Sequence, residues 1–269
     1  MRANLKRAPK KAVAAVVAAA FCAALAFFGI SLDEGAGPAR SVQSHGADTS
    51  VAQYDVREGF GQPDAQSLAN VPAYSGKDYI ELNGGVPVFT EEELDAPEGT
   101  EVYGQLDSLG RATYAFANLC EDTRPPKGST RDTKMPNPTG FVQAFYPEIG
   151  LDHLYERSHL IAYSLNDEAV NPRDLITGTE HLNQETMQPF EEAIRNCISA
   201  MNVATRSENH VIMRVTPDFR GNDLVARGVH IEALSLEDDG DSVCLNVYCY
   251  NVQPDVYIDY ATGQSHLER

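Results

Sequence analysis

Tyr155-Glu156-Arg157-Ser158-His159-Leu160-Ile161 opens the stretch of this 269-residue chain from which the fold can be predicted. The run Asp174-Leu175-Ile176-Thr177-Gly178-Thr179 comes after it and is typical of a short strand that ends in a turn. A helix is expected from Asn183 to Met201, with Pro189 in its first two turns. Its apolar residues recur at spacings of three or four, as one core-facing stripe requires: Met187, Phe190, Ile194, Cys197 and Met201. The predicted local order is strand, His159, strand, Asn183, helix.

His159 and Asn183 stand at the boundaries of this unit. A neutral imidazole can take a proton from water near pH 7, and Mg²⁺ needs only one or two protein oxygens. Glu191 lies just over two turns after Asn183, from where it could orient a metal-bound water. An activated water and a bound cation are what phosphodiester hydrolysis needs. Taken singly, the three residues also have structural interpretations: a satisfied histidine, a helix N-cap and a solvated glutamate.

The N-terminus differs from the rest. Five basic residues, namely Arg2, Lys6, Arg7, Lys10 and Lys11, precede an uncharged run from Ala12 to Ile30. This pattern is typical of an export signal or a retained membrane anchor, with the domain outside, and both alternatives stay open. Residues 31–73, rich in Gly, Ser, Ala, Gln and Asp, are predicted to be a flexible spacer before a domain over residues 74–269.

The charge balance is strongly acidic. The whole chain has 21 Lys and Arg against 39 Asp and Glu, and the first 30 residues hold five of the basic and none of the acidic ones. The remainder therefore has 16 against 39, a formal charge of −23. Such a charge counts against a polyanionic substrate, because Lys and Arg usually supply nucleic-acid affinity. The exception is a loop between Glu121 and Thr139, with four prolines and four basic residues: Arg124, Lys127, Arg131 and Lys134.

The other elements are expected to be mainly β. Tyr79 to Phe89, around Asn83-Gly84-Gly85, is predicted to be a hairpin, and Ala112 to Leu119 a strand. A meander is expected from three further runs: His210 to Thr216, Asp223 to Leu234 and Val243 to Val252. The pattern indicates one α+β domain.

Four cysteines lie beyond the N-terminal segment: Cys120, Cys197, Cys244 and Cys249. Two disulfides are permitted in an exported chain, but buried thiols or one bridge are the simpler interpretation. Cys244 and Cys249 are expected on opposite faces of a strand and therefore not to pair. Four histidines are interpreted as structural: His153, His181, His210 and His230.

The segment 155–161 resembles the Asp-Arg-Gly-His signature of the DNA/RNA non-specific endonucleases, the His-Me finger or ββα-metal nucleases. The resemblance is closest to a streptodornase-like secreted bacterial branch. It continues through 171–179, Leu182-Asn183 and Pro189-Phe190-Glu191, and through 248–263 near the C-terminus. It implies a ββα-metal core on a mainly antiparallel sheet, behind the N-terminal signal or membrane segment and the spacer.

The resemblance implies a role for each matched position. It implies that His159 is the general base, that Asn183 is the metal ligand, and that Glu191 positions the waters of the metal. Arg157 would brace the site, and Lys127, with Arg131 as a rival, would contact phosphate. The implied ion is Mg²⁺, with Mn²⁺ or Ca²⁺ as substitutes. Glu156 and Ser158 replace the Asp and Gly of the signature, and Glu180 stands where the branch commonly has Arg, which puts substrate affinity in doubt.

The resulting hypothesis is an exported or membrane-anchored, Mg²⁺-dependent endonuclease, extracellular or on the outer face of the bacterial cytoplasmic membrane. Its substrate would be DNA, with RNA left open, cut without strong sequence preference. Residues 12–30 would contact the membrane if they are not cleaved, and the sequence leaves open whether there is an inhibitor or immunity protein. The alternatives are a non-catalytic surface binding domain on the same scaffold and hydrolysis of another phosphodiester.

Overall fold

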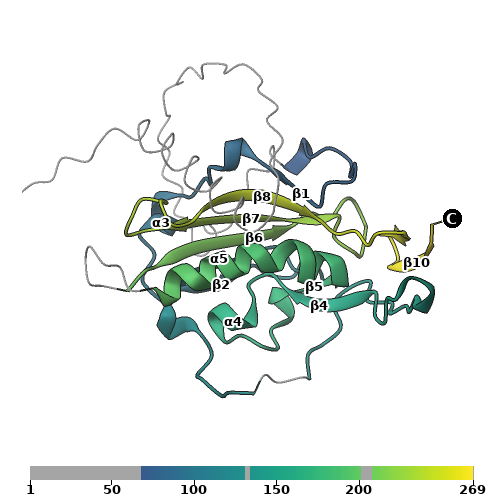
Figure 1. Ribbon diagram of the computed structural model, residues 1–269, viewed down its shortest axis with the longest axis horizontal. Helices are drawn as coiled ribbons and strands as arrows, with labels where there is room; N and C mark the ends of the chain where they lie inside the picture. The colour runs from purple at the N-terminus through teal and green to yellow at the C-terminus, as the bar shows by residue number, and fades with distance from the viewer. Residues whose placement is uncertain (1–67, 131–133, 201–207, 269) are drawn as a thin grey trace, which may run out of the picture.

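A six-stranded antiparallel sheet forms the centre of the computed structural model, which describes residues 68–130, 134–200 and 208–268 (Figure 1). In spatial order its strands are β1 (Tyr79–Glu81), β8 (Cys244–Tyr250), β7 (Gly228–Ser235), β6 (Val211–Pro217), β3 (Ala115–Leu119) and β2 (Glu101–Tyr103). The predicted meander is confirmed as β6, β7 and β8. The mixed fold with a mainly antiparallel sheet agrees with the predicted α+β class.

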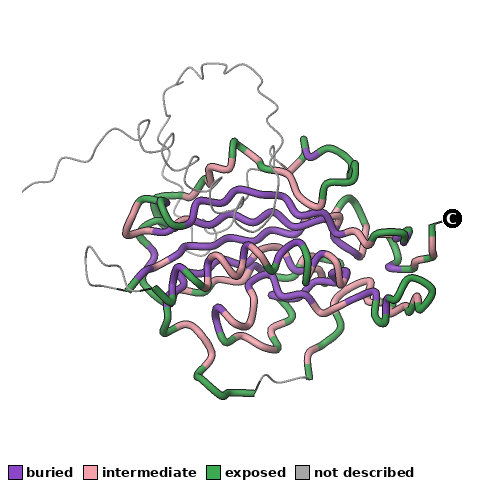
Figure 2. Tube along the Cα trace, in the orientation of Figure 1, coloured by how far each residue is buried: buried purple, intermediate pink, exposed green. Residues whose placement is uncertain are grey.

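One face of this sheet is the main hydrophobic core. Strand alternation in β6 turns Val211, Met213 and Val215 to this face, where helix α5 (Gln188–Ser199) covers them. Four members of the predicted apolar stripe are buried there: Met187, Phe190, Ile194 and Cys197. The fifth, Met201, lies outside the described residues. Figure 2 shows the three long central strands as an almost continuous buried layer.

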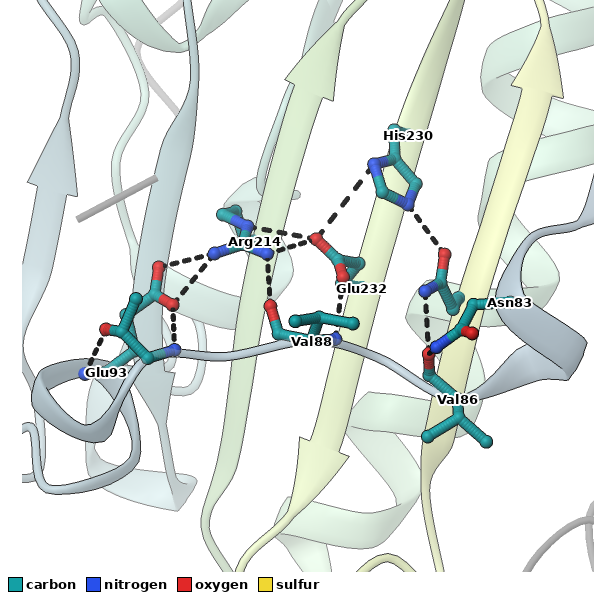
Figure 3. Close-up of polar contacts among 9 residues, drawn as sticks. Asn83, Val86, Val88, Glu93, Arg214, His230 and Glu232 are labelled. Carbon is teal, nitrogen blue, oxygen red and sulfur yellow. Dashed lines mark hydrogen bonds and ion pairs between the residues drawn. The ribbon is translucent and has the colours of Figure 1, made fainter. Parts of the chain in front are cut away.

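The opposite face of the sheet is buried as well, and on it a polar group around Arg214 lies beside an apolar cluster that includes Phe116 and Ile212; it is called the polar face below. Arg214 on β6 forms ion pairs with Glu232 on β7 and with Glu93 of the short helix α3 (Glu91–Leu94) (Figure 3). None of these three side chains is more than 3% exposed. Burying two carboxylates and one guanidinium carries a desolvation penalty unless the charges are directly paired. Here Arg214 contacts both carboxylates directly.

This polar face overturns the predicted hairpin at residues 79–89. β1 is a strand, but Asn83–Gly85 is a 3-10 turn, and the chain then crosses the sheet without forming a second strand. The backbone of Val88 pairs with side chains instead: its N–H donates to Glu232, and its carbonyl accepts from Arg214. Asn246 likewise donates to the carbonyl of Val86. Because these partners satisfy the backbone, no second strand is needed.

Two smaller sheets complete the fold. β4 (Tyr155–His159) pairs with β5 (Leu175–Thr179), and β9 (Val256–Asp259) pairs with β10 (Gln264–Leu267). A π-helix, η5 (His181–Met187), runs directly into α5. The remaining short helices are η2 (Glu121–Thr123), η3 (Pro147–Ile149), α4 (Tyr163–Asn166) and η4 (Pro172–Asp174). Figure 1 shows the β4–β5 hairpin and α5 on the same side of the central sheet.

The N-terminal features fall mostly outside the described residues, including the segment 1–30 and the spacer as far as position 67. Across the described ranges, no helix combines the length and the apolar character that a membrane crossing requires. Val71, three residues before the predicted start of the domain, is already buried with Tyr248 and Tyr250. The four cysteines beyond position 119 are all buried free thiols, so neither permitted disulfide is formed.

Candidate active site

The β4–β5 hairpin and the π-helix after it form the predicted unit. The register places His159 opposite Leu175, and Glu156 opposite Gly178. A Cβ at Gly178 would lie 2.1 Å from the Oγ of Ser158, so only glycine fits between this strand pair and η5. By strand alternation, Glu156 and Ser158 therefore face η5, whereas Arg157 and His159 face the other way.

The helix begins earlier than predicted and with different geometry. Asn183 is the third residue of η5 and is not its N-cap, so that expectation is wrong. The Oγ1 of Thr179 accepts from the N–H of Leu182, and the side chain of Gln253 accepts from the N–H of His181. Pro189 is the second residue of α5 and directly follows the π-helical turns.

Asn183 is held by a residue that the sequence interpretation treated only as a signature variant. Its Nδ2 donates to one carboxylate oxygen of Glu156, and the Nε2 of Gln184 donates to the other oxygen. An ionised carboxylate can only accept hydrogen bonds, so the atom of Asn183 that faces it must be the NH₂ group. The Oδ1 of Asn183 is thereby turned away from Glu156 and kept available as a hard oxygen ligand. The only sequence signal for this role was the acidic residue of the signature.

His159 ends β4 and is 5% exposed. Its Nε2 lies 3.2 Å from the carbonyl oxygen of Ala169. A carbonyl only accepts, so this contact assigns the proton to Nε2 and leaves Nδ1 as the basic nitrogen. The imidazole is therefore presented in the tautomer that a general base requires.

Asp174 fixes the chain just after His159, and the sequence interpretation missed it. Its backbone carbonyl accepts from the N–H of Leu160, and its Oδ1 accepts from the N–H of Ile161. The side chain is fully buried, and burial raises the pKa of its carboxyl well above the usual value. The signal available in the sequence was the position of Asp174 directly before β5, the strand that pairs with β4.

Arg157 lies on the same face of the hairpin as His159. Its Nε donates to Asn137 over 2.9 Å, and its guanidinium lies 5.0 Å from the ring centre of Phe141. Beside this face is a cavity of about 150 Å³, whose lining includes Asn137, Pro172 and Leu175. The guanidinium is thus anchored to Asn137, one of the residues that line this cavity.

Glu191 lies in the first turn of α5 and is partly exposed. Burial raises the pKa of its carboxyl to about 7, although the charge of Arg195 one turn later opposes this shift. Its described electrostatic neighbours include Asp174 and Cys249. A nearby cation would stabilise the ionised form of this carboxyl and lower its pKa again.

The basic loop contributes both exposed and engaged cations. Lys127 and Lys134 are exposed, and Arg124 is held by Glu121 and by the hydroxyl of Ser199. Arg131 lies outside the described residues. Glu180 is partly exposed, and its N–H donates to the carbonyl of Leu154, so it lies at the join of the hairpin and η5.

The structure therefore joins Asn183 to Glu156 on one face of the hairpin, and places His159 with Arg157 on the other. The described hydrogen bond of His159 goes to Ala169, and that of Asn183 goes to Glu156. Both residues belong to one strand–strand–helix unit, which is the organisation predicted for a ββα-metal nuclease.

Comparison with known proteins gives the family. The family model for DNA/RNA non-specific endonucleases matches residues 91–236, more than half of the chain, and the chain belongs to this family. A deoxyribonuclease of Streptococcus dysgalactiae subsp. equisimilis is 24% identical over 215 residues. That match covers 77% of this chain, which spans only 64% of the length of the relative.

Solved structures agree on the fold. NucA from Streptococcus agalactiae with a magnesium ion bound has a TM-score of 0.63 at 24% identity, covering 76% of this chain and 94% of that chain. The metal-free form of NucA gives a TM-score of 0.61, covering 76% and 93% at the same identity. Sda1 nuclease with a bound zinc ion gives 0.52 at 23% identity, covering 63% and 80%.

Proposed function

We propose that this protein is a divalent-metal-dependent endonuclease that hydrolyses phosphodiester bonds of DNA, and of RNA as a second substrate to be tested, without strong sequence specificity. Membership of the endonuclease family is the starting point. The single observation that supports catalysis best is the carboxylate of Glu156 on the Asn183 amide, because a binding domain would not need a free, oriented amide oxygen at this position.

The residues present fit a hard divalent cation. Asn183 would hold it through Oδ1, since the Nδ2 side is occupied by Glu156. Glu191 would accept hydrogen bonds from metal-bound waters, and its raised pKa would return toward the usual value beside a cation. When bound, the metal supplies Lewis-acid stabilisation of the phosphate and of the leaving oxygen. Mg²⁺ is proposed first, with Mn²⁺ or Ca²⁺ as substitutes.

Proton transfer falls to His159. Its Nε2–H is oriented by the carbonyl of Ala169, so Nδ1 would take the proton of the attacking water. Asp174 would keep the imidazole of His159 in place by accepting the N–H groups of Leu160 and Ile161. Arg157, anchored by Asn137 and Phe141, would stabilise the negative charge that develops on the phosphate.

Substrate contact would depend on few cations. Lys127 is exposed and is proposed to bind a phosphate, with Arg131 as the alternative. Glu180, at the join of the hairpin and η5, would repel a phosphate at that point. Backbone contacts of this kind position the nucleic acid without reading its sequence, which fits non-specific cleavage.

The organisation of the chain is part of the proposal. Residues 1–30 would be an export signal or a membrane anchor through residues 12–30, residues 31–73 a spacer, and residues 74–269 the nuclease domain. The enzyme would then act outside the cell or on the outer face of the cytoplasmic membrane. The matched relative is a streptococcal deoxyribonuclease, and the NucA and Sda1 structures contain magnesium and zinc, which supports the substrate and the class of cofactor.

Plasmid and RNA digestion by the full chain tests this function. We expect cleavage with Mg²⁺, none with EDTA, and loss of cleavage in His159→Ala and Asn183→Ala. His153→Ala is the matched control, because that exposed histidine lies outside the hairpin. Inactivity of the unaltered chain across several metals at low salt would favour the alternative, a non-catalytic binding domain on the same scaffold. Full activity of His159→Ala would refute the proposed base.

A further inference from the structure

A second group of metal-ligand side chains lies at the end of the central sheet where β2 begins, β3 ends and β6 begins. Glu98 lies in the turn just before β2, where the N–H of Thr100 donates to the carbonyl of Pro97, and Cys120 directly follows β3. The β3–β6 register pairs Leu119 with Val211, so Cys120 lies opposite His210. Cys120 and His210 therefore point to one face, the polar face that also holds Arg214, and the turn before β2 brings the side chain of Glu98 beside them.

The three side chains converge on one point. The Nε2 of His210 lies 3.2 Å from the Oε2 of Glu98, and the Sγ of Cys120 lies 3.6 Å from its Oε1. All three ligand atoms lie within 4.8 Å of one another. A tetrahedral Zn²⁺ with ordinary bond lengths has edges of about 3.3–3.6 Å between N, O and S ligands. The group therefore needs little movement to close around an ion.

Glu237 orients the ring of His210. Its Nδ1 lies 2.5 Å from a carboxylate oxygen of Glu237, whose second oxygen accepts the backbone N–H of His210. This carboxylate–histidine pairing leaves Nε2 as the nitrogen that faces Glu98 and Cys120, as in zinc sites where a carboxylate orients the histidine. Nε2 is buried and has no hydrogen-bond partner among the described residues, because its contact with Glu98 lacks hydrogen-bond angles.

The surroundings favour a cation. Cys120 is 1% exposed, whereas the side chain of Glu98 is 54% exposed, so one coordination position opens to solvent. On the outer side, Glu98 forms a second close group with Asp122 and Glu208. The negative potential of these carboxylates attracts a dication to this end of the sheet.

We propose that Glu98, Cys120 and His210 form a second metal site, which binds Zn²⁺ or a similar borderline-soft ion with solvent as the fourth ligand. It is separate from Asn183, whose donor set consists of oxygen and suits a hard ion. On binding, the thiol of Cys120 loses its proton to solvent and the thiolate coordinates the ion. The bound ion would link the ends of β2, β3 and β6 next to the C-terminal end of α5, where Asn209 caps Cys197 and Ala200.

Cobalt titration of the EDTA-treated full chain tests this site. Co²⁺ bound by a thiolate gives a near-ultraviolet charge-transfer absorption, which oxygen ligands alone do not give. We expect this absorption to saturate at one equivalent and to be displaced by Zn²⁺. It should vanish in Cys120→Ser and persist in Asn183→Ala. Cys244→Ser is the matched control, because Cys244 is also a buried free thiol on the same sheet.

Two further variants keep the test decisive if Cys120→Ser fails to fold. Glu237→Gln leaves all three ligands in place and should weaken Co²⁺ binding about 10–100-fold. Glu98→Gln changes a half-exposed side chain and should weaken Co²⁺ binding at least as much as Glu237→Gln does. Absence of the charge-transfer absorption, its survival in Cys120→Ser, or unchanged affinity in both glutamine variants would overturn the proposal. Plasmid cleavage measured in parallel reports on the Asn183 site independently.

Discussion

Replacement of Glu156 is the sharpest test of how the hairpin prepares Asn183. The carboxylate of Glu156 accepts hydrogen bonds from Asn183 and from Gln184 at once. Glu156→Ala removes both, so the Asn183 amide becomes free to rotate and presents its oxygen to the metal for only part of the time. The loss should therefore appear in the affinity for Mg²⁺ and not in the chemistry once Mg²⁺ is bound.

The magnitude depends on the kind of contact that is lost. A hydrogen bond to a charged group contributes about 1.5–3 kcal/mol, and loss of a group that orients a metal ligand lowers metal affinity about 10–100-fold. These estimates agree, because about 1.4 kcal/mol corresponds to a tenfold change. Glu156→Asp restores the residue of the family signature and should retain most of the affinity. Gln184→Ala removes only the second contact and should change the affinity about two- to threefold, a net worth near 0.5 kcal/mol.

The assay is plasmid cleavage by the full chain over a range of Mg²⁺ concentrations. We expect the Mg²⁺ concentration for half-maximal rate to rise about 10–100-fold in Glu156→Ala, with the rate at saturating Mg²⁺ within a few fold of the unaltered chain. A low maximal rate with unchanged Mg²⁺ dependence would refute the positioning role. It would mean that Glu156 acts on the substrate or on the folding of the hairpin instead.

Stability and salt dependence can be tested in the same way. In EDTA, the free energy of unfolding should fall as pH rises from about 4.5 to 7. Native Glu191, with a pKa of about 7, keeps a proton over this range that the unfolded chain releases. The full pKa shift corresponds to about 3 kcal/mol, and the partial exposure of the side chain reduces the expected effect to about 1–2 kcal/mol. Urea unfolding should show Glu191→Gln more stable than the unaltered chain at pH 8 but equal at pH 4.5, and equal stability at both would contradict this. In the same assay, Arg214→Met should lower the free energy of unfolding by about 3–5 kcal/mol, because Glu93 and Glu232 then stay buried without a cation. Changing Glu93 and Glu232 to Gln in the Arg214→Met variant should recover most of this loss. The logarithm of DNA affinity should fall with the logarithm of salt with a slope of only about −2 to −3, because the basic loop around Lys127 is expected to be the main contact with phosphates. A slope near −8 would indicate a much wider basic surface.

The local order of the hairpin unit was predictable because it depends on periodicity over short distances. The short strand-like run before Thr179 and the stripe that includes Phe190 and Ile194 are visible in the sequence, and both a strand and a helix are present there. The geometry of the first helical turns was not predictable in this way. The π-helix depends on Thr179 and Gln253 as partners of its first N–H groups, and Gln253 is 72 residues away from the group that it binds.

The hairpin predicted at residues 79–89 was wrong for a similar reason, namely partners that are distant in the sequence. Asn83-Gly84-Gly85 is a good turn sequence, and it does form a tight turn, but turn chemistry does not determine whether the next segment becomes a strand. The partners of Val86 and Val88 are side chains 160 and 144 residues further along the chain. Alternation in β6 and β7 placed Arg214 and Glu232 on one face, yet only the assembled sheet identifies the segment that covers it.

The acidity of the chain is a weaker objection to a nucleic-acid substrate once the carboxylates are located. Glu93 and Glu232 are internal and share the charge of Arg214, so they contribute little to the field outside. Glu156 faces two amide groups in the hairpin unit. A formal charge that counts every carboxylate equally therefore overstates the repulsion at the hairpin. Glu180 remains the carboxylate that a phosphate would meet beside η5, so the penalty on substrate affinity should be local to that position.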